Sequence, residues 1–230
     1  MGAERAAMAE AAELLRQLHE EDPWFLYPQA VDLLSALDAT EVPALMAALD
    51  DPSAKIRAAV ARALGAYDAV VTRAALTRAL GDAVPDVRRA AIGALGDAPD
   101  AGTVVLLAGI LTSDPDHTTR LAAVQMLAAS GDPAAVAPLT AFLRGATAED
   151  AWALAEAIAA LVEAGPAVAL APLIALLDHP AAALREQALA GLTDLGDPAA
   201  GPALRAYAAR EPDPYLGAQA RLVVGLLTEC

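Results

Sequence analysis

The chain of 230 residues has little of several residue types. Its single cysteine, Cys230, is the last residue, so an internal disulfide is excluded. Aromatic residues make up 3% of the chain, whereas 57% is hydrophobic and is dominated by alanine, leucine and valine. This composition suits thin helices that pack closely on both sides.

Long apolar runs are also missing. The best candidate, 164–177, is uncharged but short, and it contains Gly165, Pro166 and Pro172. A membrane span needs about 20 apolar residues, so we expect no membrane association. The N-terminal residues lack the basic-then-apolar order of a signal peptide. We therefore expect a cytoplasmic protein.

Basic residues are scarce, with 15 Lys and Arg against 30 Asp and Glu, a formal net charge of −15. A nucleic-acid-binding protein normally carries a basic face, so we expect no nucleic-acid partner. The acidity could attract a basic partner, but the better explanation is helix capping, because Asp before a helix accepts hydrogen bonds from free N–H groups. Acids in predicted turns are Asp50, Asp51, Asp82, Asp86, Asp97, Asp114, Asp116, Asp132, Asp178, Asp197 and Asp213.

A short phrase repeats along the chain. Arg57 is followed seven positions later by Leu64, and Arg88, Arg120 and Arg185 are each followed by a leucine at the same spacing. Recurrence with a period of about 20–50 residues is typical of repeat arrays. The period from Arg57 to Arg88 and on to Arg120 lies in this range and favours stacked helix pairs, in which each pair buries its apolar face only against its neighbours.

The breaks between helices divide the chain into about seven pairs. Helix-ending Gly and helix-starting Pro mark them, as in Asp51-Pro52 and Gly196-Asp197-Pro198. We predict one domain over 1–230, with a cap pair in 1–40 (helices near 4–20 and 28–38), regular repeats in 41–198 and a C-terminal repeat in 199–230. First helices are predicted to start near 41, 70, 102, 134, 167 and 199, and second helices near 53, 85, 117, 148, 181 and 213.

The pattern Asp-x5-Arg with Leu seven positions later resembles the short HEAT-like repeats of bacterial proteins, including the type named after phycobilisome lyases. Asp51/Arg57/Leu64 and the equivalent residues at 82/88/95 and 114/120/127 carry the resemblance, which covers the chain from about 41 onward. It implies an all-α fold, an α-solenoid (superhelix) of antiparallel helix pairs. Its implication for function is weak, because such repeats serve scaffolds, chaperone-like subunits and a few enzymes.

The repeated arginine falls within the apolar arc of its helix, where an unpaired charge would be costly. We predict that it pairs with the aspartate in the preceding turn, six positions earlier in three rungs and seven positions earlier for Arg185. The expected ladder along the stack consists of Asp51, Arg57, Asp82, Arg88, Asp114, Arg120, Asp178 and Arg185.

The family resemblance implies that second helices line a concave face. Their solvent positions should lie one, two and five places after the arginine position. Many are small, among them Ala58, Ala59 and Ala90, which would let a partner approach closely. The larger candidates for binding are Arg62, Arg89, Leu121, Gln125, Glu156, Glu186, Gln187 and Gln219.

The fourth repeat breaks the phrase, because Leu154 takes the arginine position and Trp152 precedes it. Trp152 is either a plug between repeats or a binding hot spot. Trp24, Phe25 and Tyr27 concentrate three of the few aromatics. They either seal the cap pair onto the first repeat or form a docking site beside the concave mouth.

Catalytic motifs are missing. His117 and His179 occupy similar turns two repeats apart, on the order of 20 Å at normal helix spacing, too far to share a metal. With His19 they make up all the histidines, and we expect no metal, no cofactor and no phosphate-binding loop.

The leading hypothesis is a scaffold that binds a peptide, helix or protein surface in its concave groove. The alternative is an enzyme or ligand chaperone in which Glu156 or Glu186 acts as an acid–base group in a groove pocket. A third possibility is self-association through the apolar C-terminal helix at 222–227.

Overall fold

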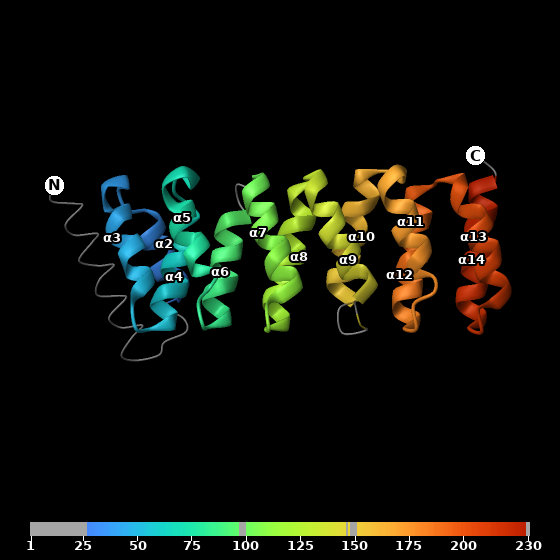
Figure 1. Ribbon diagram of the computed structural model, residues 1–230, viewed down its shortest axis with the longest axis horizontal. Coiled ribbons are helices and arrows are strands. Elements are labelled where there is room, and N and C mark those ends of the chain that lie inside the picture. Colours follow the sequence, from blue (N-terminus) through green and yellow to red (C-terminus); the bar gives the residue numbers. More distant parts are fainter. Residues whose placement is uncertain (1–26, 97–99, 146, 148–150, 229–230) are drawn as a thin grey trace. The chain divides into compact units, whose positions relative to one another are not determined.

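The computed structural model describes residues 27–96, 100–145, 147 and 151–228. The predicted helix at 4–20, the aromatic residues Trp24 and Phe25, and the side chains of Tyr27 and Trp152 lie outside the described part. Throughout that part the regular structure is helical, with no strand (Figure 1). No described helix is long and apolar enough to span a membrane.

The helices follow the predicted order, and each predicted start falls within three positions of an observed one. The first helices of the pairs are α3 (Val42–Ala47), α5 (Ala69–Ala79), α7 (Ala101–Ser113), α9 (Val136–Gly145), α11 (Pro166–Leu176) and α13 (Gly201–Arg210). The second helices are α4 (Ala54–Leu64), α6 (Pro85–Gly96), α8 (His117–Ser130), α10 (Ala151–Ala164), α12 (Ala182–Leu195) and α14 (Pro214–Thr228). The second helix of the cap pair is α2 (Tyr27–Ser35), and short 3₁₀ turns precede α3, α9 and α13. The structure is thus the predicted solenoid of helix pairs.

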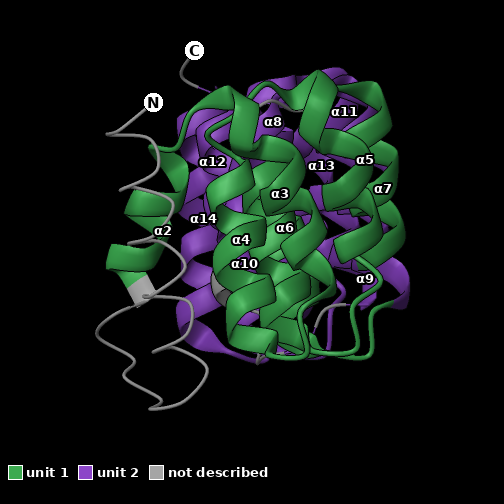
Figure 2. Cartoon of the chain, turned by 90° about the vertical axis from the view of Figure 1, so that its left-hand side faces the viewer, with its two compact units in different colours: residues 1–110, 114–126 green, residues 111–113, 127–230 purple. Residues whose placement is uncertain are grey.

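The pairs divide into two compact units (Figure 2). Unit 1 comprises residues 1–110 and 114–126, and unit 2 comprises 111–113 and 127–230. Neighbouring second helices pack against one another within each unit, as α4 does on α6 and α10 does on α12. The expectation of a single domain over 1–230 stays a prediction.

Aspartates set the helix starts. The carboxylates of Asp51, Asp82, Asp114, Asp116, Asp132, Asp197 and Asp213 each accept a hydrogen bond from a backbone N–H two or three positions further on. These bonds satisfy donors that a helix start leaves free. Three other turn acids, Asp50, Asp86 and Asp178, form ion pairs, and Asp97 lies outside the described residues. Capping thus accounts for most of the described turn acids.

Small residues allow the helices to pack closely. In unit 1 a Cβ added at Gly65, directly after α4, would lie 2.9 Å from the Ala94 Cα of α6. In unit 2 a Cβ added at Gly191 of α12 would lie 2.6 Å from the Ile158 Cγ2 of α10. Protein interiors have little room for an extra methyl group. The alanine and glycine content therefore reflects the short distance between neighbouring second helices.

Candidate functional site

The arginine ladder exists, but its carboxylate partners differ from those predicted. Arg57 Nε and Nη2 donate to the two carboxylate oxygens of Asp82, at 2.7 and 2.9 Å. Asp82 lies in the turn of the following repeat. Towards its own turn, Arg57 donates only to the carbonyl oxygens of Asp51 and Pro52. The expected pair with the Asp51 carboxylate is therefore wrong, and the ion pair joins two repeats.

The next rung is the most buried of the described ion pairs. Arg88 donates to both carboxylate oxygens of Asp114 at 2.7 and 2.8 Å, and the side chains are 8% and 5% exposed. Arg88 also donates to the carbonyl oxygens of Asp82 and Ala83. Asp82 thus accepts hydrogen bonds from Arg57 through its carboxylate and from Arg88 through its backbone carbonyl. Within unit 1 the ladder runs from Arg57 through Asp82 and Arg88 to Asp114, whose carbonyl accepts a hydrogen bond from Arg120. Residues 146 and 148–150, which begin 26 positions after Arg120, lie outside the described part.

Unit 2 has a rung of the same kind, formed by Arg185 and Glu211. Arg185 donates to both carboxylate oxygens of Glu211 at 2.9 Å and to the His179 and Pro180 carbonyls. The predicted partner, Asp178, instead forms an exposed ion pair with Arg210. A sequence signal for these partners exists, because each acid follows its arginine at a sequence separation of 25 or 26.

The contacts in these rungs change the pKa values of their acidic groups. The hydrogen bond from Arg57 lowers the pKa of Asp82. Burial alone would raise the pKa of Glu211, but hydrogen bonds from Arg185, Tyr207 and the Asp213 N–H outweigh it and lower this pKa to about 2. Burial, with the nearby Glu211 carboxylate, raises the pKa of Tyr207 to about 12. These carboxylates stay ionised at neutral pH, as a structural ladder requires.

At one rung, both the arginine and its acidic partner are replaced by other residues. Leu154, at the arginine position of α10, is fully buried, and His179 stands at the matching place in the next turn, where the other rungs carry Asp or Glu. The His179 Nδ1 accepts a hydrogen bond from the Ala181 N–H, the same capping bond that Asp82 accepts from Val84. A carboxylate at position 179 would face no arginine, whereas a neutral imidazole can still cap the helix. The break therefore replaces both the arginine and the carboxylate of the rung.

In unit 1 the predicted binding face is smaller than expected. Ala58, Ala59 and Ala90 are buried rather than exposed, because neighbouring helices cover them in the unit 1 core. Arg62 is exposed, and Leu121 and Gln125 are half-buried. Arg89, the other predicted basic group, is half-buried and forms ion pairs with Asp86 and Asp116. Its charge is already balanced within the unit.

Unit 2 presents a different surface on α10 and α12. At 100° per residue, the buried Ala153, Leu154, Ala157 and Leu161 of α10 fall on one side, and the exposed Ala155, Glu156, Ala159 and Glu163 fall on the other. Four carboxylates occupy these exposed sides, separated by exposed alanines. We call this surface the acidic face; it comprises Ala155, Glu156, Ala159 and Glu163 of α10 and Glu186, Ala190 and Asp194 of α12. Gln187 is half-buried beside it, and Gln219 is half-buried on α14.

Pockets lie between helices in both units, and three of them are lined by described residues alone. A pocket of about 70 Å³ lies in unit 1 between α5 and α6, beside Tyr67 and Arg73. One of about 220 Å³ lies in unit 2 between α9 and α11, beside Arg144 and His179. The largest, of about 520 Å³, lies in unit 2 around the ends of α8 and α10. Glu156 and Glu186 line none of the three, so these pockets do not supply the environment that the alternative acid–base role needs. The described residues hold no cluster of three potential metal ligands.

Comparisons with known proteins agree with the helical repeat fold. Two sequence models for HEAT repeats match the chain, one over 74–151 and 143–225 and the other over 42–69. The HEAT-like repeats protein of the archaeon Thermococcus onnurineus is 17% identical with a TM-score of 0.54, covering 95% of this chain and 97% of that one. YibA of Escherichia coli is 18% identical with a TM-score of 0.56, covering 94% and 82%. A designed armadillo repeat protein is 20% identical with a TM-score of 0.50, covering 81% and 100%. No curated protein matches the sequence.

Proposed function

The chain belongs to the HEAT repeat family, and we propose that it is a protein-binding scaffold whose acidic face binds a basic segment of a partner protein. HEAT arrays offer extended surfaces of the kind that bind proteins. The observation that carries the proposal is the acidic face itself, with exposed Glu156, Glu163, Glu186 and Asp194 on two adjacent helices of unit 2.

The charge of this region is unusually one-sided. Between Arg120 and Arg185, Arg144 is the only lysine or arginine in the sequence. Arg185 forms an ion pair with Glu211, so neither α10 nor α12 presents a free cation on the acidic face. A surface potential of one sign attracts a partner of the opposite sign and speeds its association.

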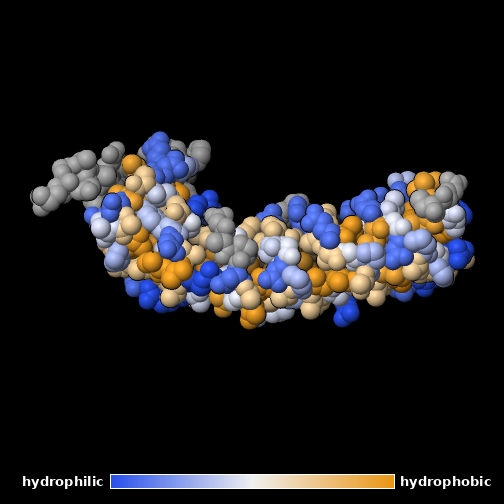
Figure 3. Space-filling model, turned by 90° about the horizontal axis from the view of Figure 1, so that it is seen from above, coloured by the Kyte–Doolittle hydropathy of each residue, from blue (hydrophilic) through white to orange (hydrophobic). Residues whose placement is uncertain are grey.

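The shape of the acidic face supports the same proposal. Ala155, Ala159 and Ala190 lie between the carboxylates, so the backbone of a bound helix or extended segment can approach closely. Lysine and arginine side chains of that segment would then reach carboxylates on both helices. On the side of the molecule shown in Figure 3, exposed apolar residues are interspersed with hydrophilic ones.

A titration with a synthetic peptide tests the proposal. The probe is a fluorescein-labelled peptide of alternating Lys and Ala, with a Glu–Ala peptide of the same length as its counterpart, followed by fluorescence anisotropy at low and physiological salt. We expect the Lys peptide alone to bind, and the double variant Glu156→Gln/Glu186→Gln to bind it about 5- to 30-fold more weakly, since each exposed charge pair contributes about 0.5–1 kcal/mol.

The matched control is Asp32→Asn/Glu41→Gln, which removes two negative charges from unit 1. It should leave the affinity within about twofold of that of the unaltered protein, because many exposed ion pairs contribute nothing measurable. Equal weakening by both double variants would show that net charge alone attracts the peptide and would reject the acidic face. Absence of binding to the Lys peptide would reject the proposed function.

A further inference from the structure

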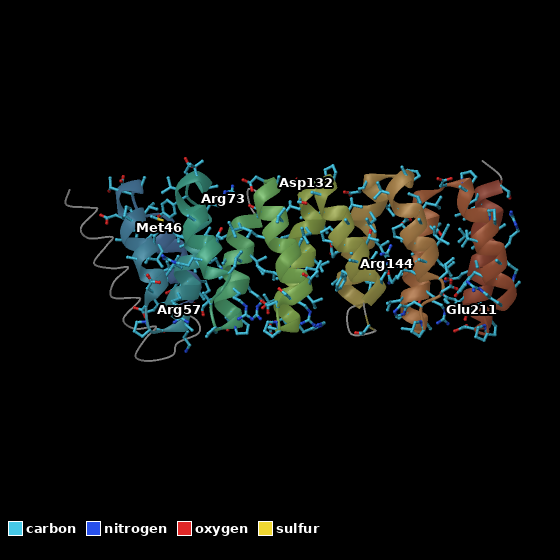
Figure 4. All side chains as sticks on the ribbon, in the orientation of Figure 1. Met46, Arg57, Arg73, Asp132, Arg144 and Glu211 are labelled. Carbon is cyan, nitrogen blue, oxygen red and sulfur yellow. The ribbon has the colours of Figure 1, made fainter. Side chains whose placement is uncertain are left out.

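The largest of the three pockets lies at the end of the helices opposite the ladder. It has a volume of about 520 Å³, within the usual range for binding pockets of about 300–1,000 Å³. In unit 2, Asp132 at this pocket and Glu211 at the ladder lie at opposite ends of the helix pairs (Figure 4). The pocket is therefore separate from the structural ion pairs, and its residues are free to serve another purpose.

The walls of the pocket are apolar, and many of its side chains are small. Leu127, Leu139, Leu161 and Val168 supply the larger apolar surfaces. Between them the lining consists of Ala128, Gly131, Pro133, Ala135, Val136, Ala160 and Ala164. Gly131 adopts φ 60°, a left-handed conformation that favours glycine, where the chain turns from α8 towards α9. The small side chains leave the space between the two helix ends unfilled.

Two carboxylates accompany the apolar walls. Asp132 is half-buried and accepts a hydrogen bond from the Ala134 N–H. Glu163 is exposed and has no hydrogen-bond or ion-pair partner among the described residues. Glu163 is also a member of the acidic face, so the pocket and that face are adjacent on α10. An apolar cavity edged by unpaired negative charge complements an apolar group next to a positive one.

We infer that this pocket receives the apolar side chain of an anchor residue, leucine or an aromatic, which lies beside lysines or arginines in the partner segment. The inference rests on the proposed function and adds to it the second half of the recognition motif. Anchor residues that fill a pocket dominate the energy of many interfaces, while surrounding charges set orientation and specificity. The acidic face would hold the basic residues, and the pocket at its end would hold the anchor.

The test varies a single position of a basic peptide. The probes are fluorescein-labelled Lys-Lys-Ala-X-Ala-Lys-Lys peptides with X as Trp, Leu or Ala. Burial of the Trp or Leu side chain should give about ten- to hundredfold tighter binding than Ala. The variant Ala164→Trp fills the pocket from an exposed lining position and should abolish this preference. The control Ala171→Trp places the same side chain at an exposed site of α11 outside the pocket and should preserve it.

The outcomes separate the two proposals. If all three peptides bind equally, and Glu156→Gln/Glu186→Gln weakens each, the pocket inference is overturned while the acidic face stands. If no basic peptide binds, the proposed function fails and the pocket inference fails with it. Tryptamine serves as the free-ligand probe. Tryptamine that binds as tightly as the Trp peptide would make the pocket a small-molecule site and overturn its role as an anchor site.

Discussion

Replacement of Arg88 by leucine tests whether the ladder stabilises the stack. Arg88 donates two hydrogen bonds to Asp114 and two to backbone carbonyls of the preceding turn. Its removal leaves the Asp114 carboxylate, 5% exposed, without its cation. Removal of one partner from a buried ion pair typically costs about 3–5 kcal/mol, because the remaining charge is uncompensated. We expect Arg88→Leu to lower the free energy of unfolding of unit 1 by this amount.

Arg78 provides a matched control in the same unit. It forms an ion pair with Asp50 at 3.7 Å, but the side chains are 63% and 74% exposed. Water screens such a pair, so Arg78→Leu should cost only about 0–1 kcal/mol. Urea unfolding followed by circular dichroism gives the total effect. Hydrogen exchange of the α6 amides shows whether the loss is local, since repeat arrays can open one repeat at a time.

The chain itself suggests the compensating change. Leu154 and His179 take the places of the arginine and the carboxylate in one rung, so Arg88→Leu combined with Asp114→His reproduces that pair in unit 1. At about pH 8 the imidazole is neutral and can still cap α8, so the double variant should recover about 2 kcal/mol of the loss. A stabilising ladder is refuted if Arg88→Leu costs no more than Arg78→Leu, or if the double variant is no more stable than the single one.

Three further predictions concern other contacts. The pKa of Glu211 is about 2 in the folded protein and 4.5 ordinarily. Its contribution to stability is therefore complete above about pH 4.5 and is lost as pH falls towards 2. Glu211→Gln should make the urea midpoint of unfolding fall less steeply with decreasing pH in that range. Gly191→Ala should destabilise unit 2 by about 1–3 kcal/mol, because the new Cβ meets Ile158. Gly93→Ala, with open space around it, should instead stabilise its helix by about 0.5–1 kcal/mol. Thermal unfolding of both variants distinguishes crowding from helix propensity. Tyr67→Phe removes the hydroxyl that donates to carbonyls near the end of α2. The amides of α2 should then exchange faster, because the local stability falls by about 1–2 kcal/mol. Unchanged exchange would assign the link between α2 and α4 to apolar packing alone.

Local chemistry allowed most of the fold to be predicted. The breaks at Asp51-Pro52 and Gly196-Asp197-Pro198 mark helix ends because Gly, Pro and Asp act within one turn of themselves. The period of the phrase indicates stacked pairs for a similar reason, since each repeat contacts only its neighbours. The family models and the helices confirm both expectations.

The candidate site was less accessible to sequence reasoning. Glu156 and Glu186 were identified from their spacing after the arginine position, and both are exposed; their role in binding stays a prediction. Ala58 and Ala90 occupy comparable positions but are buried, because burial depends on which helix packs alongside. The pocket had no sequence signal, since it arises where the small side chains around Gly131 leave space between helix ends.

The sequence by itself determined the helix pairs, their caps and the recurrence of a charged rung, because each depends on residues within one or two turns. Only the tertiary structure decided which charges meet. The arginine side chain reaches its own turn and the next one equally well, and stacking places the carboxylate of Asp82 before Arg57 while offering only backbone carbonyls from Asp51. The distance between repeats, which no single repeat encodes, makes the ladder a link between repeats rather than within them.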